Sequence, residues 1–347
     1  MIGEVRATEG GHFVEADVDG VPVWFASEEE TLCTDAVAPA SALMLPALHA
    51  ERAVHTDGAL WPRWRTGMSE LQHILHEWWG YPELAPTSAV PDAESPPPAA
   101  GRALLFSGGV DSFYSLLRAG TEADRLVFVH GFDVPLADEA HAAVAIAAMR
   151  EAASAVGARP VVVRTNLREH PAVAAVPWER AHGGALAAVG HVLADHVGTV
   201  HVSATYARDR SPPWGSHWRT DKLWSSERVS LVHTGAEHRR AEKLLLVADE
   251  PLVQRHLRVC WKSEGGTINC SRCDKCLLTM LVLDRAGKLG SFDVFDPPRS
   301  LARALRGLPS TIYVRTVAGL LEQELPFSLR RALSGLQRRS HTARNLP

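Results

Sequence analysis

A run of glycine, serine and aspartate in the first half of the chain has the composition of a phosphate-binding loop. Residues 107–112 read SGGVDS, between a hydrophobic segment and a helical pattern. Glycine lets the backbone turn sharply and bring its N–H groups close to a phosphate, and the following helix N-terminus favours a polyanion. We therefore expect a phosphate-bearing ligand here, although a plain strand-to-helix turn would use similar residues. The residues expected to bind it are Ser107, Gly108, Gly109, Val110, Asp111 and Ser112.

Three side chains of this loop offer more than backbone contacts. Ser107 and Ser112 carry hydroxyl donors, and Asp111 is the carboxylate expected to hold a Mg²⁺ ion that bridges phosphate oxygens. Asp111 and Ser112 are therefore the candidate catalytic residues of the loop. A Walker A loop would require a lysine after the glycines, and none follows them here. Transfer of a γ-phosphate is therefore disfavoured.

Four of the five cysteines lie close together late in the chain. Cys260 is followed by nine residues and then by Cys270, Cys273 and Cys276 at CxxC spacing. Four thiolates complete the tetrahedral shell of a structural zinc ion, so we expect Zn²⁺ here. An iron–sulfur cluster is the main alternative, because four cysteines can also ligate one, and buried free thiols are a third. Cys33 lies apart and is expected to be a small buried residue.

Together the two motifs resemble those of the PP-loop, or N-type, ATP pyrophosphatases. SGGVDS after a hydrophobic strand looks like the PP-loop, and one cysteine followed by a loop and CxxCxxC is similar to the zinc site of the 7-cyano-7-deazaguanine synthases. The resemblance covers residues 101–118 and 260–276. It does not extend to the first 100 residues or to the C-terminal tail.

The resemblance implies an ATP-dependent ligase. Such enzymes cleave ATP between its α and β phosphates, adenylate a carboxylate or amide oxygen, and let a nucleophile displace AMP. The acceptor would be a small molecule or a protein-terminal carboxylate, and the donor ammonia or an amine. Two other interpretations stay open: a PP-loop sulfur transferase acting on tRNA or a small molecule, and a non-catalytic nucleotide-binding zinc module.

Candidate acceptor-side residues follow the fourth expected strand, in a long loop at positions 206–224. His217, Asp221 and Lys222 could orient a carboxylate, take a proton or neutralise pyrophosphate, so they are the other candidate catalytic residues. A loop held to the surface by its tryptophans would look the same. His130 and Asp133 lie where the resemblance places the adenosine, although a structural histidine and a turn-forming aspartate explain them equally well. Weaker candidates at the head of another helix are Trp178, Glu179 and His182.

The elements that must position these residues alternate between buried strands and helices. Strands are expected at 103–106, 126–129, 161–163, 200–203 and 229–233, and helices at 112–119, 139–156 and 181–196. Asp138 is a plausible N-cap of the second helix. This alternation predicts an α/β fold with a doubly wound parallel sheet, in which ligands bind at the carboxyl ends of the strands. The resemblance implies that this sheet and its helices form a HUP-like PP-loop domain.

The sequence divides into four segments. Residues 1–83 are expected to form a small α+β domain, with a hairpin turn at Asp19 and Gly20 and a helix whose capping box starts at Ser69. Residues 84–100 read as a Pro/Ala-rich linker. Residues 101–290 are the expected PP-loop domain with its zinc site, and 291–347 a basic helical tail.

Composition limits the class of protein and its partners. Hydrophobic residues make up 46% of the chain and the formal net charge is −4, as in ordinary globular proteins, so a polycation devoted to nucleic acid is excluded. Contact of the basic tail with nucleic acid is a weaker expectation, and so is a homodimer. No apolar run approaches the length of a membrane span and the N-terminus lacks a signal-peptide pattern, which predicts a cytoplasmic protein without membrane contact.

Overall fold

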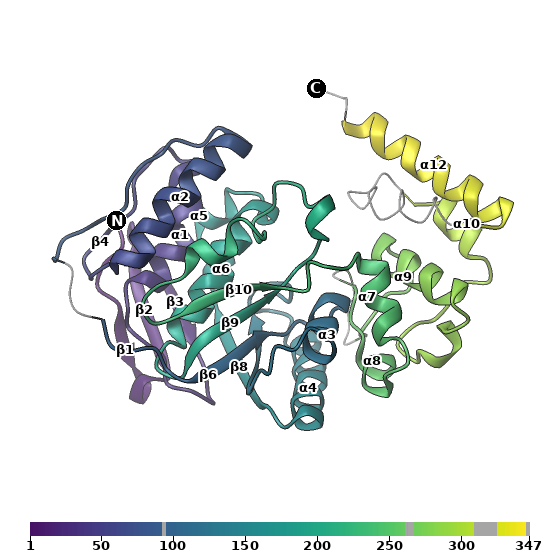
Figure 1. The fold of residues 1–347 in the computed structure, drawn as a ribbon, viewed down its shortest axis with the longest axis horizontal. Helices are drawn as coiled ribbons and strands as arrows, with labels where there is room; N and C mark the ends of the chain where they lie inside the picture. The colour runs from purple at the N-terminus through teal and green to yellow at the C-terminus, as the bar shows by residue number, and fades with distance from the viewer. Residues whose placement is uncertain (92–94, 261, 263–266, 309–324, 345–347) are drawn as a thin grey trace.

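The structure, a computed structural model, describes residues 1–91, 95–260, 262, 267–308 and 325–344 (Figure 1). Within these residues the chain is α/β, with one mostly parallel sheet of eight strands. In sheet order the strands are β1 (Arg6–Thr8), β2 (Phe13–Val18), β3 (Val21–Ala26), β8 (Arg159–Thr165), β7 (Arg125–His130), β6 (Gly101–Leu105), β9 (Val197–Ser203) and β10 (Ser230–Thr234). The five strands predicted from sequence correspond to β6 to β10, which confirms their type and approximate positions.

The order of the parallel strands reverses between β6 and β9. Numbered along the chain from β6, the parallel strands lie in the sheet in the order 3-2-1-4-5. The chain therefore adds β7 and β8 on one side of β6, and then β9 and β10 on the other side. Helices cover both faces, as in a doubly wound sheet. Ala103 and Leu105 of β6 belong to the core cluster shared with α1 (Val37–His49) and α6 (Trp178–Val192), whereas Leu104 faces α3 (Val110–Leu117) and α4 (Glu139–Val156).

The helix predicted at 139–156 is confirmed with its bounds. Asp138 caps it, accepting a hydrogen bond from the backbone N–H of His141 at 3.1 Å. A capping aspartate followed by an alanine-rich segment carries its own start signal, so little tertiary information was needed. Gly157, with φ of 71°, ends the helix in the left-handed region that glycine adopts readily.

The strands of the N-terminal segment continue the central sheet. Asp19 and Gly20 form the expected hairpin turn between β2 and β3, both at positive φ. β3 then pairs antiparallel with β8, Phe25 opposite Thr165 and Ala26 opposite Arg164. Residues 84–91 are tied to the same segment, because β5 (Thr87–Ser88) pairs with β4 (His55–Thr56). The N-terminal segment thus shares a sheet and a hydrophobic core with strands β6 to β10.

The capping box predicted at Ser69 is wrong. The helix there, α2 (Pro62–Trp79), begins two turns earlier, with Trp61 as the N-cap and Pro62 in the first turn. Proline fits that position because its fixed φ suits a helix and its missing N–H would have no partner there. Gln72 is instead buried mid-helix, where its side-chain N–H donates to the carbonyl oxygen of Met68.

The C-terminal part is helical in the residues described. After the short α5 (Pro171–Ala174), the remaining helices are α7 (Arg240–Val247), α8 (Pro251–His256), α9 (Asp274–Arg285), α10 (Leu301–Arg306) and α12 (Phe327–Arg344). Arg315, part of the expected basic tail, lies outside the described residues. Of the helices that can be described, none is both long and apolar enough to cross a membrane.

Replacing Gly67 with alanine should destabilise the fold. A Cβ atom there would lie 2.0 Å from the carbonyl oxygen of Leu223, where α2 packs on the 206–224 loop, so helix and loop would have to separate. We expect a loss of about 1–3 kcal/mol in the free energy of unfolding, measured by urea denaturation. The control is Gly290→Ala, because an added Cβ at Gly290 meets nothing within 4 Å. Equal stability of the two variants would contradict this packing.

Candidate functional site

A pocket of about 290 Å³ opens at the carboxyl ends of β6, β7 and β9. This is the point where the strand order reverses, and open α/β sheets bind their ligands there. The SGGVDS segment, residues 107–112, is called the phosphate loop after the ligand expected from its sequence. It lines one end of the pocket with Ser107, Gly109, Asp111 and Ser112. The location predicted for the loop, between a strand and a helix at the carboxyl edge of the sheet, is confirmed.

The phosphate loop is held in a turned conformation by short contacts. Gly108 has φ of 73°, which a side chain would disfavour, and its carbonyl oxygen accepts a hydrogen bond from the backbone N–H of Arg258 at 2.8 Å. Gly109 precedes α3 as its N-cap residue in an extended conformation. The hydroxyl of Ser112 donates to the Gly109 carbonyl oxygen at 3.0 Å. The loop therefore needs little rearrangement to present the first turn of α3 to a ligand.

Asp111 forms ion pairs with two cations from α7. Its carboxylate lies 2.6 Å from Arg240 Nη1 and 3.2 Å from Lys243 Nζ. Lys243 is fully buried, and its ammonium group also donates to the carbonyl oxygen of Ala204 at 2.5 Å. Asp111 was expected to ligate Mg²⁺, but in this structure it acts as the counter-ion of a buried lysine.

Further cations around the phosphate loop were missed by the sequence analysis. The buried Arg258 donates from Nε to the Ser107 carbonyl oxygen at 3.0 Å, and burial lowers the pKa of its guanidinium. Lys275 also lines the pocket, and burial lowers the pKa of its ammonium. In the sequence Arg258 lies two positions before Cys260, and Lys275 lies between Cys273 and Cys276. Their place beside the metal motif was the signal that could have identified them.

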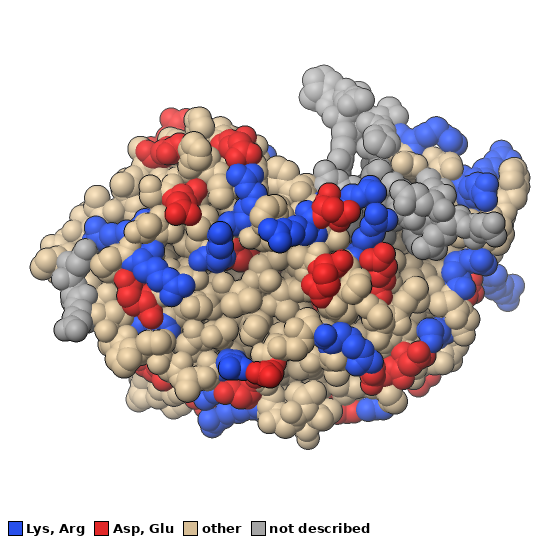
Figure 2. Space-filling view, viewed as in Figure 1, with Lys and Arg blue, Asp and Glu red and all other residues tan. Residues whose placement is uncertain are grey.

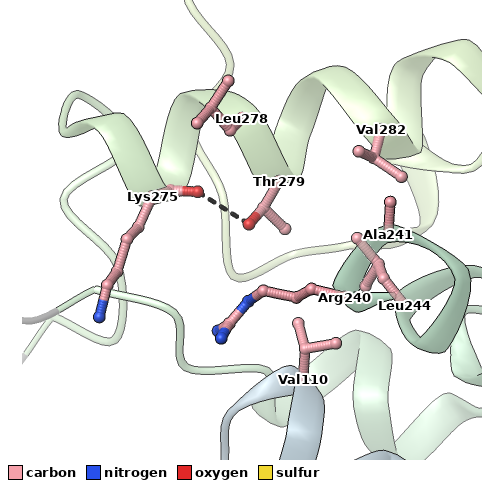
Figure 3. A pocket seen from close by; sticks show the side chains of 8 residues that line it. All are labelled: Val110, Arg240, Ala241, Leu244, Lys275, Leu278, Thr279 and Val282. Carbon is pink, nitrogen blue, oxygen red and sulfur yellow. Dashed lines mark hydrogen bonds between the residues drawn. The ribbon is translucent and has the colours of Figure 1, made fainter. Parts of the chain in front are cut away.

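Arg240 and Lys275 also border a smaller pocket of about 30 Å³ between α3, α7 and α9. Figure 3 shows Arg240 extending from α7 past Val110, while Lys275 extends from α9 towards the same side. The hydroxyl of Thr279 donates to the Lys275 carbonyl oxygen at 2.8 Å. Both cations line the main pocket as well, and Val110 of the SGGVDS loop lines this recess, so the recess adjoins the main pocket.

The other end of the main pocket is aromatic. The rings of Phe132 and Trp178 lie 5.1 Å apart, and those of Tyr206 and Trp214 lie 5.5 Å apart, each pair edge to face. His182 packs between Trp178 and Trp214. The carboxylates that line the pocket beside these rings are Glu179 and Asp133. A basic end and an aromatic end with carboxylates suit a ligand that combines phosphate with a flat ring.

His130 and Asp133 lie differently, although His130 is the last residue of β7 and Asp133 follows shortly after it. Asp133 lines the pocket, with its carboxylate 3.9 Å from Arg258 Nη2. His130 is buried, with its Nε2 3.0 Å from the carbonyl oxygen of Pro135, and it does not line the pocket. Of the two residues expected beside the adenosine, the structure therefore brings only Asp133 to the pocket.

His217, Asp221 and Lys222 lie outside the pocket lining. Asp221 is buried and accepts hydrogen bonds from the backbone N–H of His217 at 2.9 Å and from the Ser216 hydroxyl at 2.7 Å. It also lies 2.7 Å from His233 Nδ1 on β10, so it fastens the 206–224 loop to the sheet. Lys222 is exposed. The loop thus contributes Tyr206 and Trp214 to the pocket, and its three candidate catalytic residues hold the loop or face solvent.

The four late cysteines form a cluster whose sulfur atoms all lie within 4.8 Å of one another. The Cys260–Cys273, Cys270–Cys276 and Cys273–Cys276 sulfur pairs are 3.7, 4.0 and 3.5 Å apart. Zinc–sulfur bonds of about 2.3 Å in a tetrahedron place the sulfurs about 3.8 Å apart, so the spacing fits a zinc ion. Cys260 also lines the main pocket, which places the cluster at the pocket wall.

Local structure around the cluster explains how the thiols meet. Asn269 is buried and its side-chain oxygen accepts hydrogen bonds from the backbone N–H groups of Val259 at 2.9 Å and Cys260 at 3.2 Å. Cys273 is the N-cap residue of α9, and its backbone N–H donates to Cys270 Sγ at 3.3 Å. Hydrogen bonding from Cys273 lowers the pKa of the Cys260 thiol. Hydrogen bonding with Cys260 raises the pKa of the Cys273 and Cys276 thiols, so a cation between the sulfurs is needed for all four to ionise, as in a metal site.

Stability should decrease as the pH falls, because two histidines are buried in neutral form. Burial lowers the pKa of His191 and of His217 to about 4, from 6.5 when unfolded. The unfolded chain therefore takes up these protons first, and stability is lost between about pH 6.5 and about pH 4, by about 1.4 kcal/mol per pH unit for each histidine. Urea unfolding at several pH values measures this slope. His191→Gln should reduce the slope of unfolding free energy against pH, whereas His73→Gln, at an exposed position, should leave that slope unchanged.

Comparison of the chain with protein-family models, with curated proteins and with solved structures finds no match. The function is therefore inferred from the chain's own residues. They combine a turned glycine loop, three pocket cations, an aromatic wall and a four-cysteine cluster in one place. Such a site can bind a polyphosphate, neutralise charge on a departing phosphate group, and hold a flat partner beside it.

Proposed function

We propose that this chain is an AMP- and pyrophosphate-forming ligase of the PP-loop superfamily, built on a HUP-like domain and similar to the 7-cyano-7-deazaguanine synthases. The observation that carries the proposal is the SGGVDS loop at the strand-order reversal, facing three cations in one pocket. A loop without a Walker lysine needs cations from elsewhere to neutralise a triphosphate. Here Arg240, Arg258 and Lys275 supply them from outside the motif.

In this proposal the phosphates of ATP bind the backbone N–H groups of the loop and the hydroxyls of Ser107 and Ser112. Asp133 lies at the end of β7 beside the adenosine, and the wall formed by Trp178 and Trp214 holds the acceptor. Mg²⁺ bound with ATP would neutralise phosphate oxygens, and Asp111, which pairs with Arg240 and Lys243 in the structure, is the loop carboxylate that would hold it. The aromatic wall favours a flat acceptor, because rings stack on rings.

The chemistry has two steps. An acceptor carboxylate oxygen attacks the α-phosphorus of ATP, and pyrophosphate leaves towards the pocket cations, which stabilise its charge. A nitrogen nucleophile then attacks the adenylated carbonyl carbon and AMP leaves. Glu179 is the pocket carboxylate placed to accept the proton that the nucleophile loses. The four cysteines would hold Zn²⁺ and brace the wall that carries Arg258 and Lys275.

The test is AMP formation with a panel of carboxylates. The purified protein is incubated with ATP, Mg²⁺, ammonia and each acceptor in turn, including 7-carboxy-7-deazaguanine, and AMP and pyrophosphate are quantified. We expect acceptor-dependent AMP in amounts equal to pyrophosphate. ADP as the nucleotide product would overturn the proposal, and AMP formation that requires a sulfur donor in place of ammonia would make the protein a sulfur transferase.

A pair of lysine variants locates the reaction. Lys275→Gln removes a pocket cation and should lower the rate of AMP formation by about 10²-fold, because charge on the departing pyrophosphate loses one of its partners. Lys288→Gln is the matched control, since Lys288 forms an ion pair with Asp249, just after the C-terminal end of α7, and does not line the pocket. Equal activity of the two variants would place the reaction elsewhere.

A further inference from the structure

Charge is strongly segregated along the chain. Residues 297–347 contain nine arginines, no lysine and two glutamates, a formal charge of +7. The whole chain carries −4, so the preceding 296 residues carry −11. Charge asymmetry of this size between parts of one chain is typical of proteins with a polyanionic partner.

The structure brings the arginines of α10 and α12 to one end of the molecule. α12 packs on α10, and Figure 2 shows basic side chains at the end of the molecule where the two helices lie. No acidic residue occurs in the parts of this segment that the structure describes, 297–308 and 325–344. We call this set of exposed residues the arginine surface: Arg299, Arg303, Arg306, Arg330, Arg331, Arg338 and Arg339.

Three arginines of the arginine surface form no ion pair with a carboxylate in the described part of the chain. In the part of the chain that the structure describes, ion pairs are formed by many arginines of the acidic body, such as Arg125 and Arg228. No such pair joins Arg303, Arg330 or Arg331 to a described carboxylate. Guanidinium groups without a carboxylate partner are suited to phosphate, which they bind with two parallel hydrogen bonds.

We infer that the arginine surface binds the phosphate backbone of nucleic acid. An anionic membrane is the other extended polyanion, but a membrane-bound amphipathic helix inserts its apolar face. The apolar face of α12 is already buried, with Leu329, Leu333 and Leu336 in the core cluster that also contains Leu305 of α10. Phe327, 79% exposed at the start of α12, is available to stack on a base of a single strand.

Binding of the full-length protein to labelled single-stranded RNA and DNA of about 20 nucleotides, and to a duplex, tests the inference without ATP. We expect micromolar affinity at about 50 mM salt and roughly 10- to 100-fold weaker binding at about 200 mM. The three probes distinguish RNA from DNA and single strands from duplex. Because no turnover is measured, this result is independent of the proposed ligase activity.

Paired variants show where the nucleic acid binds. Arg330→Gln with Arg331→Gln should weaken binding and lower the salt slope by about 1.4, the share of two phosphates on a single strand. Arg6→Gln with Arg150→Gln removes the same charge from two exposed sites elsewhere and should change little. Three results would each overturn the inference. The protein could fail to bind nucleic acid at low salt, the two pairs of substitutions could weaken binding equally, or the protein could bind phosphatidylserine vesicles but no nucleic acid.

Discussion

Asp111→Asn should lower AMP formation by at least about 10²-fold, the largest loss of activity expected from one substitution in this chain. The asparagine keeps the shape of the side chain and one hydrogen-bond acceptor, but it removes the negative charge that positions Arg240 and Lys243 beside the phosphate loop. Coupled measurement of AMP release, at saturating ATP and acceptor, records the loss. Full activity in this variant would contradict the role given to the loop.

Asp111→Ala should lower the stability of the protein as well as its activity. Lys243 is fully buried, so removing its counter-ion leaves a buried charge without compensation, at a cost of about 3–5 kcal/mol. Alanine and asparagine both remove this counter-ion, so both variants should lose stability as well as activity. Adding Lys243→Met to Asp111→Asn removes the unpaired charge and should restore stability without restoring AMP formation. Asp249→Asn, at an exposed position, is the control for loss of one carboxylate.

Cys273→Ser should lose both the metal and several kcal/mol of stability. Serine is a poor zinc ligand at neutral pH, and Cys273 lies within 3.7 Å of two other cluster sulfurs, so the tetrahedral shell cannot close without it. We expect close to one zinc per chain in the native protein and under about one tenth in the variant, measured by elemental analysis. Iron with visible charge-transfer absorption would instead indicate a cluster.

Cys33 supplies the matched control for this experiment. It is buried like Cys273, but its sulfur accepts a hydrogen bond from Arg228 and lies outside the four-cysteine cluster. Cys33→Ala should therefore keep its zinc and lose only the stability that belongs to a small buried side chain. Native zinc content in Cys273→Ser would show that the cluster is not the metal site.

Local signals made parts of the fold predictable. The strands of the parallel sheet are short runs of Val and Leu, and the helix after Asp138 starts with its own capping residue. Where a stronger signal lay upstream, the local pattern misled: Ser69 looked like a helix start, but Pro62 had already begun the helix. The joining of the N-terminal hairpin to β8 was not predictable, because pairing between Phe25 and Thr165 depends on contacts 140 positions apart.

What the sequence by itself determined is the pair of motifs, SGGVDS and the four spaced cysteines, because each consists of residues close in the sequence whose spacing largely sets their geometry. Only the tertiary structure decided what surrounds them. It brought Arg240 and Lys243 to Asp111, placed Arg258 and Lys275 at the pocket, and left His217, Asp221 and Lys222 outside it. The physical reason is that charge partners and pocket walls come from separate elements, and only packing of the sheet and helices sets their distances.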